Sequence, residues 1–414
     1  MIIRFIALCV FILLVDWYFF QSVKNLIAGW QPKNKNIAIY IYWGFTVFAI
    51  GMLVLAAAIQ PNNANRVFQK YTFNVFLIIT IAKFLGVLPL LIEDAVRLLR
   101  WAFSYTGEQK NIPGAHTISR SKFVSRLALG FAAVPFVGLV YGMVKTAFDY
   151  SIKRVTIKLP NLPQEFDGFT IVQISDLHTG SLPGTHPYER AVEMINGLKP
   201  DVIFMTGDLV NNIADEAVDF VPVLKQLTSP NGVYSILGNH DYGDYVPWDN
   251  EEAKAKNLQK VKDIHRQMGW KLMLNENALI TRGNQSIALL GVENWGHKLN
   301  FPKYGIMADA YKGIEDAPVK LLLSHDPSHW EGEVIPKYAD VDVTFSGHTH
   351  GFQFGIEIPG FVKWSPSQYV YKQWGGLYQE GKQYIYVNRG LGFLGYLGRV
   401  GIPPEISVIT LKKS

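Results

Sequence analysis

Apolar residues are concentrated in the first third of this 414-residue chain. Four stretches there are long and apolar enough to cross a bilayer as helices, which takes about 20 residues each. They cover residues 2–21, 37–59, 72–95 and 124–146. Short polar segments rich in turn-forming residues separate them, as at 31–36 and 60–66. The pattern therefore predicts a membrane unit of about four helices over residues 1–150.

The hydrophobic pattern changes near residue 155, where short β-rich apolar runs begin to alternate with helical segments. This alternation is typical of an α/β domain, which we expect over residues 155–414. Helical spacing is found at 186–198, 215–227 and 251–268. The expected strands are 168–174, 201–206, 232–237, 286–291, 319–324, 341–346, 383–388 and 405–411.

Composition supports a membrane protein without a nucleic-acid partner. Hydrophobic residues make up 49% of the chain and the mean hydropathy is +0.11, high values for a wholly soluble protein. The net charge is +5, but much of the Lys and Arg excess flanks the apolar stretches, where bilayer anchoring explains it. Cys9 is the only cysteine. An intrachain disulfide and a cysteine-based zinc site are therefore excluded, and metal chemistry must use His, Asp and Asn.

Details of the apolar stretches bear on their role. Arg4 precedes the first stretch as in a signal peptide, but no small-residue cleavage pattern follows and three more stretches do, so we expect it to be retained. Asp16, Glu93 and Asp94 lie near predicted span ends, where they would anchor the interface. Lys83 lies nearer the middle of a span, and a functional role for it stays open because charge in hydrocarbon is costly.

Sidedness is indicated by two weak signals. An even number of spans puts both termini on one side, and a slight excess of Lys and Arg in the loops after spans one and three predicts that the α/β unit lies outside the cytoplasm. The segment Ser119-Arg120-Ser121-Lys122-Phe123-Val124 also resembles a twin-arginine export signal. Ser121 replaces the second arginine of that signal.

Short polar motifs follow the predicted strands of the α/β unit, at the carboxyl ends where open sheets bind their ligands. Gly207 allows the backbone to pass close to whatever Asp208 binds, and a carboxylate can bridge two cations. Burying so many polar groups without metals would be costly. Isolated histidines, by contrast, are expected to be structural: His186, His265, His297 and His329. The residues of the motifs are Asp176, His178, Asp208, Asn239, His240, Asp241, His325, His348 and His350.

In this order the motifs resemble those of the calcineurin-like metallophosphoesterase superfamily over residues 165–411. The form Ile174-Ser175-Asp176-Leu177-His178, the run Gly390-Leu391-Gly392 and the ending Pro403-Pro404-Glu405-Ile406 are similar to the membrane-associated YkuE-like and YaeI-like branch. The multi-span leader resembles bacterial members with a helical membrane unit. The resemblance implies a metallophosphoesterase β-sandwich flanked by helices, in a multi-pass protein of the bacterial inner membrane.

The resemblance also implies roles for the motif residues. His240 would act as general acid or as a positive contact to phosphoryl oxygens, and Asp241 would orient it. Asp208 would bridge two divalent metal ions, for which the mixed ligands favour Mn, Fe or Zn. One ion would be held by Asp176, His178, Asp208 and His350, and the other by Asp208, Asn239, His325 and His348.

The expected activity is that of a metal-dependent phosphoric ester hydrolase acting on a phosphomonoester, phosphodiester or pyrophosphate. UDP-2,3-diacylglucosamine, a substrate of lipid A synthesis in related bacterial proteins, is one candidate, but it needs a cytoplasmic site. Cell-envelope or other lipid-linked phosphates are the alternative. The competing class is a non-catalytic metal-dependent receptor or transport accessory, which loss of a ligand or of His240 would mark. Neither is lost.

Two arginines and five aromatic residues are candidates for substrate binding. Arg389 and Arg399 could make bidentate contacts to an anionic substrate, or surface salt bridges. Five aromatic residues would either line an apolar groove for a lipid-linked phosphate or belong to the core. They are Trp295, Trp364, Tyr369, Phe393 and Tyr396.

Overall fold

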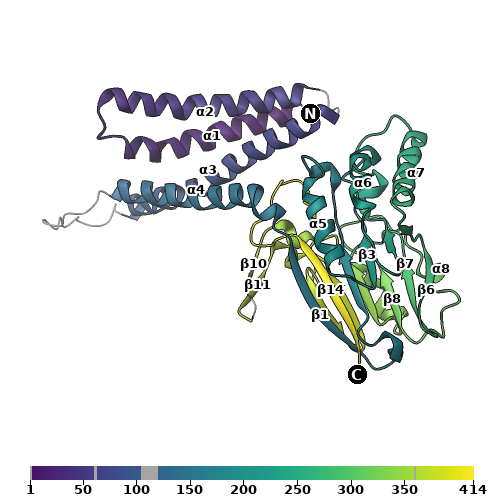
Figure 1. The fold of residues 1–414 in the computed structure, drawn as a ribbon. Coiled ribbons are helices and arrows are strands. Elements are labelled where there is room, and N and C mark those ends of the chain that lie inside the picture. The colour runs from purple at the N-terminus through teal and green to yellow at the C-terminus, as the bar shows by residue number, and fades with distance from the viewer. Residues whose placement is uncertain (1, 60–62, 104–119, 359) are drawn as a thin grey trace. The chain divides into compact units, whose positions relative to one another are not determined.

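The computed structural model describes residues 2–59, 63–103, 120–358 and 360–414. The chain divides into two compact units, Met1–Tyr141 and Gly142–Ser414. The first is helical and the second is a mixed α/β domain, as Figure 1 shows. The division of the sequence into a membrane unit over residues 1–150 and an α/β unit over residues 155–414 stays a prediction. Residues 60–62 of one polar segment, and Ser119 of the export-like segment, lie outside the described residues.

The helical unit confirms four candidate membrane spans. Its helices are longer than the apolar stretches that predicted them, because polar residues at their ends continue the helical backbone. Large apolar side chains such as Val47, Phe48 and Val137 are exposed on their surfaces, as lipid-facing helices require. The helices are α1 (Ile2–Leu26), α2 (Pro32–Ala58), α3 (Asn63–Phe103) and α4 (Arg120–Val144).

A buried ion pair joins Asp16 of α1 to Lys83 of α3. Tyr42 donates a hydrogen bond to Asp16 Oδ1 over 3.0 Å, and Thr46 donates one over 3.3 Å. The expectation that Asp16 lies near a span end is wrong, since α1 continues to Leu26 and leaves Asp16 in its interior. Lys83, whose role stayed open, is the partner that neutralises this carboxylate.

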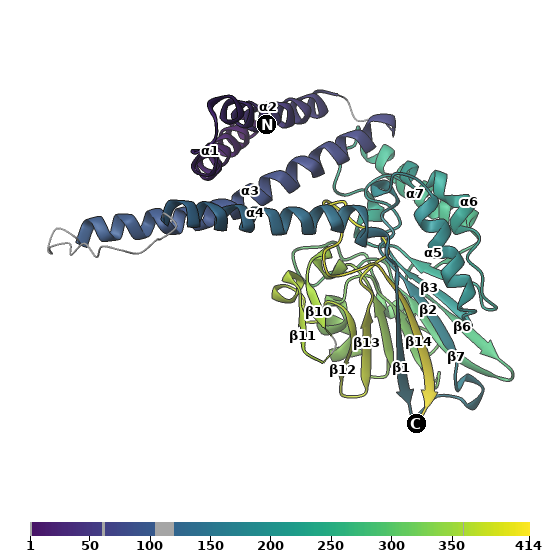
Figure 2. The ribbon, with the colours of Figure 1, turned by 60° about the vertical axis from the view of Figure 1, so that its left-hand side comes forward.

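The α/β unit contains two six-stranded sheets and a separate hairpin (Figure 2). All eight predicted strands are present, and six were not predicted. The first sheet has the order β1 (Ser151–Leu159), β14 (Glu405–Lys413), β2 (Thr170–Ile174), β3 (Val202–Thr206), β4 (Val233–Ile236), β5 (Lys271–Leu272). The second has the order β12 (Gly376–Glu380), β13 (Gln383–Val387), β9 (Val343–Ser346), β8 (Lys320–Leu323), β7 (Gln285–Gly291), β6 (Glu276–Arg282). The hairpin consists of β10 (Ile356–Ile358) and β11 (Val362–Trp364).

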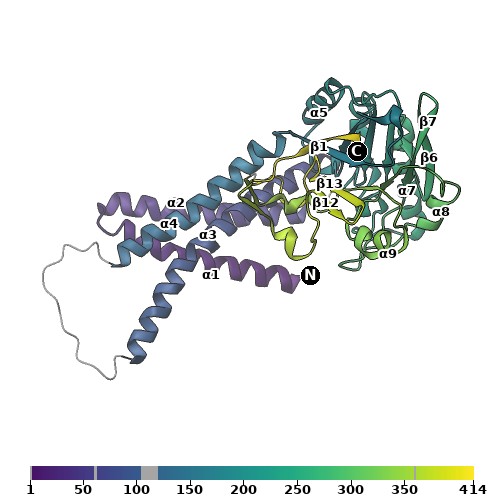
Figure 3. The ribbon, with the colours of Figure 1, turned by 90° about the horizontal axis from the view of Figure 1, so that it is seen from below.

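The main core of this unit lies between the two sheets. Phe204 of the first sheet and Phe345 of the second are fully buried there, with ring centroids 5.1 Å apart. A second cluster on the outer face of the second sheet includes Trp330 and Val334. Figure 3 shows α5 (His186–Gly197) and α9 (Ile335–Lys337) on opposite sides of the sheets. The sandwich with flanking helices is thus confirmed.

Two of the three predicted helices in this unit are present, as α5 and α7 (Glu251–Gln267). Asn250 caps α7 by accepting the N–H of Ala253 over 2.8 Å. The expected helix over 215–227 is wrong. It is replaced by two 3-10 turns and the short α6 (Val221–Leu224). Pro222 explains the break, because proline begins a helix readily but lacks the backbone N–H that would continue the hydrogen bonds of a preceding helix.

Strand direction brings the motif loops together. In the first sheet β2, β3 and β4 are parallel, and in the second β7, β8, β9 and β13 are parallel. The loops after β2, β3, β4, β8 and β9 carry the motif residues. Parallel strands end at the same edge of a sheet, so five loops from distant parts of the sequence meet there.

Candidate metal centre

The backbone of the motif loops is strained at the residues that point into the site. Asp176, His178, Asp208, His348 and His350 all have positive φ angles, between 47° and 70°. Non-glycine residues rarely adopt this left-handed region, and such strain persists mainly where the surrounding structure imposes it for function. The five predicted ligands therefore share a conformation that general stability disfavours.

One group of side chains consists of Asp176, His178 and His350, all buried. The Nε2 atoms of His178 and His350 lie 3.0 Å apart, and His350 Nε2 lies 3.2 Å from Asp176 Oδ1. The Asp176 carboxylate also accepts the backbone N–H of His348 at 3.0 Å. That bond fixes the loop after β9 against the loop after β2.

A second group consists of Asp208, His325 and His348, with Asn239 among them. His325 Nε2 lies 3.1 Å from Asn239 Oδ1, and His348 Nδ1 lies 2.8 Å from the same oxygen. Tyr245 accepts a hydrogen bond from Asn239 Nδ2 over 2.8 Å. This bond turns the amide so that its oxygen, the atom able to bind a cation, faces the two imidazoles.

Asp208 lies between the two groups. Its Oδ2 atom is 3.6 Å from His178 Nε2 in the first group and 3.1 Å from His325 Nε2 in the second. Its Oδ1 atom accepts the backbone N–H of His240 over 2.9 Å. Since Oδ1 is held by the backbone, Oδ2 is the oxygen that both groups share.

These residues fit two cations. Burial lowers the pKa of His178 well below its ordinary value, so its imidazole is neutral, and the close approach of two ring nitrogens requires a proton or a cation between them. Burial acts the same way on His325, but the charges of Asp208 and Asp176 outweigh it and raise the pKa of His325 to about 10. A metal ion binding there must displace that proton, as is usual for histidine ligands.

Comparison with known proteins supports this description. The transmembrane domain of a probable calcineurin-like phosphoesterase matches residues 2–147, and the calcineurin-like phosphoesterase domain matches residues 169–352. The uncharacterised metallophosphoesterase YkuE of Bacillus subtilis is 31% identical over 306 residues, which cover 72% of this chain and 99% of YkuE. The chain belongs to the calcineurin-like metallophosphoesterase family. This confirms the resemblance drawn from the motifs, and the family implies hydrolase activity at a metal centre.

Other relatives share the catalytic part. A transmembrane protein with a metallophosphoesterase domain from Danio rerio is 28% identical over 284 residues, covering 66% of this chain and 60% of that protein. The UDP-2,3-diacylglucosamine pyrophosphatase LpxG of Chlamydia trachomatis is 28% identical over 312 residues, covering 63% of this chain and 89% of LpxG.

The hydrogen bonds of Asp241 differ from the role expected for it. Its buried carboxylate does not orient His240. It accepts four backbone N–H groups instead, those of Asp208, Leu209, Val210 and Gly238, over 2.9 to 3.1 Å. Burial, with the nearby charge of Asp208, raises the pKa of Asp241 to about 7. The ring of His240 is oriented by the carbonyl oxygen of Asn211, 2.6 Å from Nδ1. Asp241 therefore stabilises the loop that carries Asp208.

Sequence reasoning missed the residues behind the ligands. Tyr371 lies 2.9 Å from His348 Nε2, and its hydroxyl reaches Asp326 Oδ2 at 3.4 Å. Asp326 directly follows His325 and Tyr245 lies four residues after Asp241, so their positions near motifs were the available signal, whereas Tyr371 lies far from any motif.

The two arginines proposed as substrate contacts are buried in structural bonds. Arg389 pairs with Glu405 and, over 2.7 Å, with Glu357. Arg399 donates to the backbone carbonyl of Arg389 over 2.8 Å and lies 3.3 Å from His350 Nδ1. Neither lines the pocket. Their guanidinium groups hold the loop after β13. Substrate binding by either arginine stays a prediction, and these contacts give it no geometric support.

An open pocket of about 350 Å³ adjoins Asp208, Asn239, His240, His348 and His350. Its lining is mostly apolar, and it includes none of the five aromatic residues that were expected either to line a groove or to belong to the core. Phe393, for example, is buried and packs on Phe148. The apolar and aromatic lining consists of Tyr245, Leu299, Phe301, Phe352, Val370, Tyr371 and Leu394.

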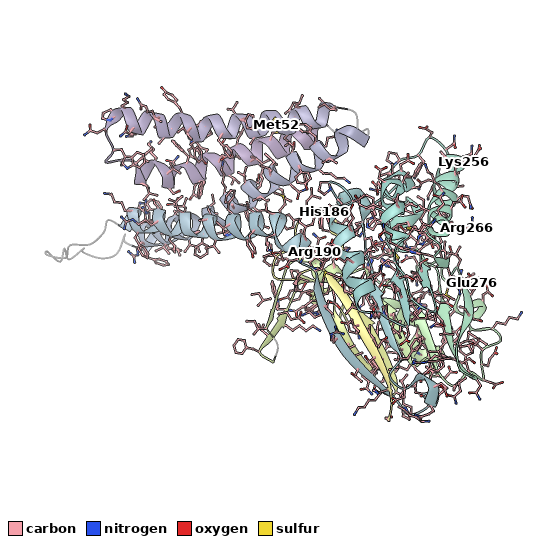
Figure 4. All side chains as sticks on the ribbon, in the orientation of Figure 1. Met52, His186, Arg190, Lys256, Arg266 and Glu276 are labelled. Carbon is pink, nitrogen blue, oxygen red and sulfur yellow. The ribbon has the colours of Figure 1, made fainter. Side chains whose placement is uncertain are left out.

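The isolated histidines lie elsewhere. His186 is at the beginning of α5 on the surface, beside Glu189 (Figure 4). His265 is buried and lies 2.9 Å from Ser235 Oγ, and buried His329 lies 2.8 Å from Ser324 Oγ. The backbone of His297 bonds Ser328. None of the four belongs to either metal-binding group.

Proposed function

We propose that this chain is a membrane-anchored phosphoesterase with two divalent metal ions, hydrolysing phosphoester or pyrophosphate bonds. The observation that carries the proposal is the position of Asp208 Oδ2 between His178 and His325. One ion would be held by Asp176, His178, Asp208 and His350, and the other by Asp208, Asn239, His325 and His348.

Manganese, iron or zinc suits this mixture of nitrogen and oxygen ligands. When bound, two such cations neutralise phosphoryl oxygens and make water more acidic, so that it can attack phosphorus at neutral pH. The protein's own contribution is positioning: the strained backbone and the second layer of Asp241, Tyr371 and Tyr245 fix the ligands before any substrate arrives.

His240 is proposed to assist at the phosphoryl group. Because a carbonyl oxygen only accepts, the contact with Asn211 puts a proton on Nδ1 and leaves Nε2 free to exchange one. A protonated ring would contact phosphoryl oxygens or give its proton to the leaving oxygen. The apolar pocket wall lies beside it.

The substrate is proposed to carry an apolar part next to its phosphate. The mostly apolar lining of the pocket supports this, because it suits a lipid-linked compound better than a small soluble one. UDP-2,3-diacylglucosamine, named for LpxG, is one such candidate. It requires the catalytic unit to face the cytoplasm, whereas the loop charges favour the opposite side of the bacterial inner membrane, where cell-envelope phosphates are the candidates.

The test is a metal-supplemented hydrolysis screen of the purified full chain against soluble and lipid-linked phosphate compounds, with a reporter fused to the C-terminus to determine sidedness. Hydrolysis that needs added Mn, Fe or Zn is expected. Stoichiometric ligand or metal binding without turnover of any compound would favour the receptor alternative.

A further inference from the structure

The hairpin of β10 and β11 has its polar face toward the domain. Glu357 Oε1 lies 2.7 Å from Arg389 Nη2, and Lys363 Nζ donates to the hydroxyl of Tyr378 over 3.0 Å. Glu357 pairs opposite Lys363 in the ladder, so the two charged side chains occupy one face. Their partners are residues of the catalytic unit.

The opposite face is apolar. Side chains alternate along a strand, and the residues that flank the charged pair are Ile356 opposite Trp364 and Ile358 opposite Val362. Ile356 and Ile358 are each about half exposed. This is the reverse of the usual arrangement in a soluble protein, in which the apolar face of a hairpin covers the core and the polar face meets water.

Further large apolar side chains continue this face, and we call its exposed members the apolar rim. Phe361, at the turn of the hairpin, is 86% exposed, and Tyr369 is 76% exposed. Trp364 donates its indole N–H to the Tyr369 hydroxyl over 3.3 Å, and such amphipathic rings are enriched where protein meets a bilayer surface. The apolar rim consists of Phe352, Phe354, Ile356, Ile358, Phe361, Tyr369 and Val370.

The apolar rim is continuous with the pocket. Phe352 and Val370 belong to both. The segment is tied to the loop after β9 through Ser365 Oγ, which donates to the carbonyl oxygen of Gly351 over 2.6 Å. Gly351 follows His350 directly. A molecule held by the rim therefore lies beside the proposed metal ligands.

The rim is also joined to the end of the fourth candidate span, which covers Lys122–Phe148. Gly355 donates its N–H to the carbonyl of Val400 over 2.9 Å, and the preceding Arg399 donates its N–H to the carbonyl of Gly142 over 3.1 Å. These contacts all lie within Gly142–Ser414. The residues that end this span therefore belong to the same compact unit as the rim.

We propose that the apolar rim inserts into the interfacial layer of the bilayer in which the four helices are embedded, so that the pocket opens onto lipid head groups. An exposed apolar surface bordered by the Trp364–Tyr369 pair fits a lipid interface. The substrate class is then a phosphate carried by a membrane lipid. The substrate class rests on the proposed function, whereas the docking of the apolar rim on the bilayer does not.

The docking is tested with the full chain in lipid nanodiscs. A fluorophore is attached at Phe361→Cys in a Cys9→Ser background, with Lys382→Cys, in the exposed turn between β12 and β13, as the matched control. Lipids bearing a quencher in the upper acyl chain are expected to quench the label at position 361 several-fold more than at 382. Aqueous iodide should do the reverse.

Equal iodide quenching at both positions would overturn the docking. Shielding of position 361 from both quenchers would also overturn it, because a second copy or another protein would then be the occupant.

The substrate class is tested with Phe361→Asp, with Lys382→Asp as its control. Phe361 does not line the pocket, so hydrolysis of a soluble chromogenic phosphodiester should stay within about twofold of wild type. Hydrolysis of phosphatidic acid or CDP-diacylglycerol in nanodiscs should fall about tenfold or more in the first variant only. Equal rates on the lipids in both variants would overturn the role of the apolar rim in presenting them, and hydrolysis of the soluble diester without turnover of either lipid would overturn the lipid class. Absence of turnover on every compound would contradict the proposed function, while the quenching result would still report on docking.

Discussion

The Nδ1 atom of His240 lies 2.6 Å from the backbone carbonyl oxygen of Asn211. That oxygen is positioned by its loop, since the N–H of Asn211 donates to Glu216 Oε2 over 2.7 Å. The next N–H groups upstream are held by Asp241. The orientation of His240 thus depends on backbone that two buried or half-buried carboxylates hold in place.

Replacement of His240 should separate catalysis from metal binding. The ring belongs to neither metal-binding group, so His240→Ala should retain its metal content. Hydrolysis of a chromogenic phosphodiester should fall by about 10²-fold or more, the usual contribution of a positioned acid. His186→Ala, on the surface of α5, is the control. Unchanged turnover would remove His240 from the mechanism.

Tyr371→Phe should weaken metal binding without touching a ligand. It removes the hydroxyl that lies 2.9 Å from His348 Nε2 and connects it to Asp326. Loss of such an outer partner typically costs about 10- to 100-fold in metal affinity. Calorimetric titration of metal into the stripped protein measures this, with the exposed Tyr369→Phe as control. Wild-type affinity in Tyr371→Phe would show that the hydroxyl does not support His348.

The ion pair between Asp16 and Lys83 should stabilise the helical unit, and the stability effects of replacing its two residues should not be additive. Lys83→Met leaves the buried carboxylate of Asp16 without its cation, a change that typically costs about 3–5 kcal/mol. The double variant Asp16→Leu with Lys83→Met should recover most of that loss. Thermal unfolding in nanodiscs measures both, with Arg97→Met as control because Arg97 is mostly exposed in its pair with Glu93. Additive losses in the double variant would contradict the coupling.

Acid sensitivity of the catalytic unit should depend on His265. Burial lowers the pKa of His265 to about 3, below the value of about 6.5 expected in the unfolded chain. Between these values the unfolded state binds a proton that the folded state does not, so stability falls as the pH decreases from about 6.5 toward 3, by at most about 1.4 kcal/mol per pH unit. Denaturant midpoints at pH 7 and pH 5 should differ less in His265→Gln. An equal difference would exclude this contribution.

Features that depend on the local pattern of residues could be predicted from the sequence. Buried parallel strands are continuous apolar runs, and the residues directly after Thr206 or Ser346 necessarily lie at the sheet edge, so both the strands and the convergence of the motif loops were foreseeable. Contacts between distant segments were not. The strand Ser151–Leu159 is stabilised by pairing with β14, which lies at the other end of the domain's sequence. Its mixture of apolar and basic residues carries no mark of that partner.

Side-chain roles were foreseeable only where motif position defines them. Asp241 follows His240 in sequence, which favoured an orienting role, but the turn Asn239–Tyr242 directs its carboxylate to the backbone of the neighbouring loop. The sequence left open whether five aromatic residues line a groove or belong to the core, and it did not reveal the residues that line the pocket. Phe352 enters it through a left-handed backbone, with φ of 55°, which composition cannot reveal.

The most direct test of the two-metal centre is metal content per chain and hydrolysis rate, measured on the same samples of wild type and Asp208→Asn. We expect two divalent ions in wild type, loss of activity on exhaustive chelation and its return on adding Mn, Fe or Zn. Asp208→Asn should hold fewer ions and stay inactive. Full activity of chelated wild type, or two tightly bound ions in active Asp208→Asn, would contradict the account.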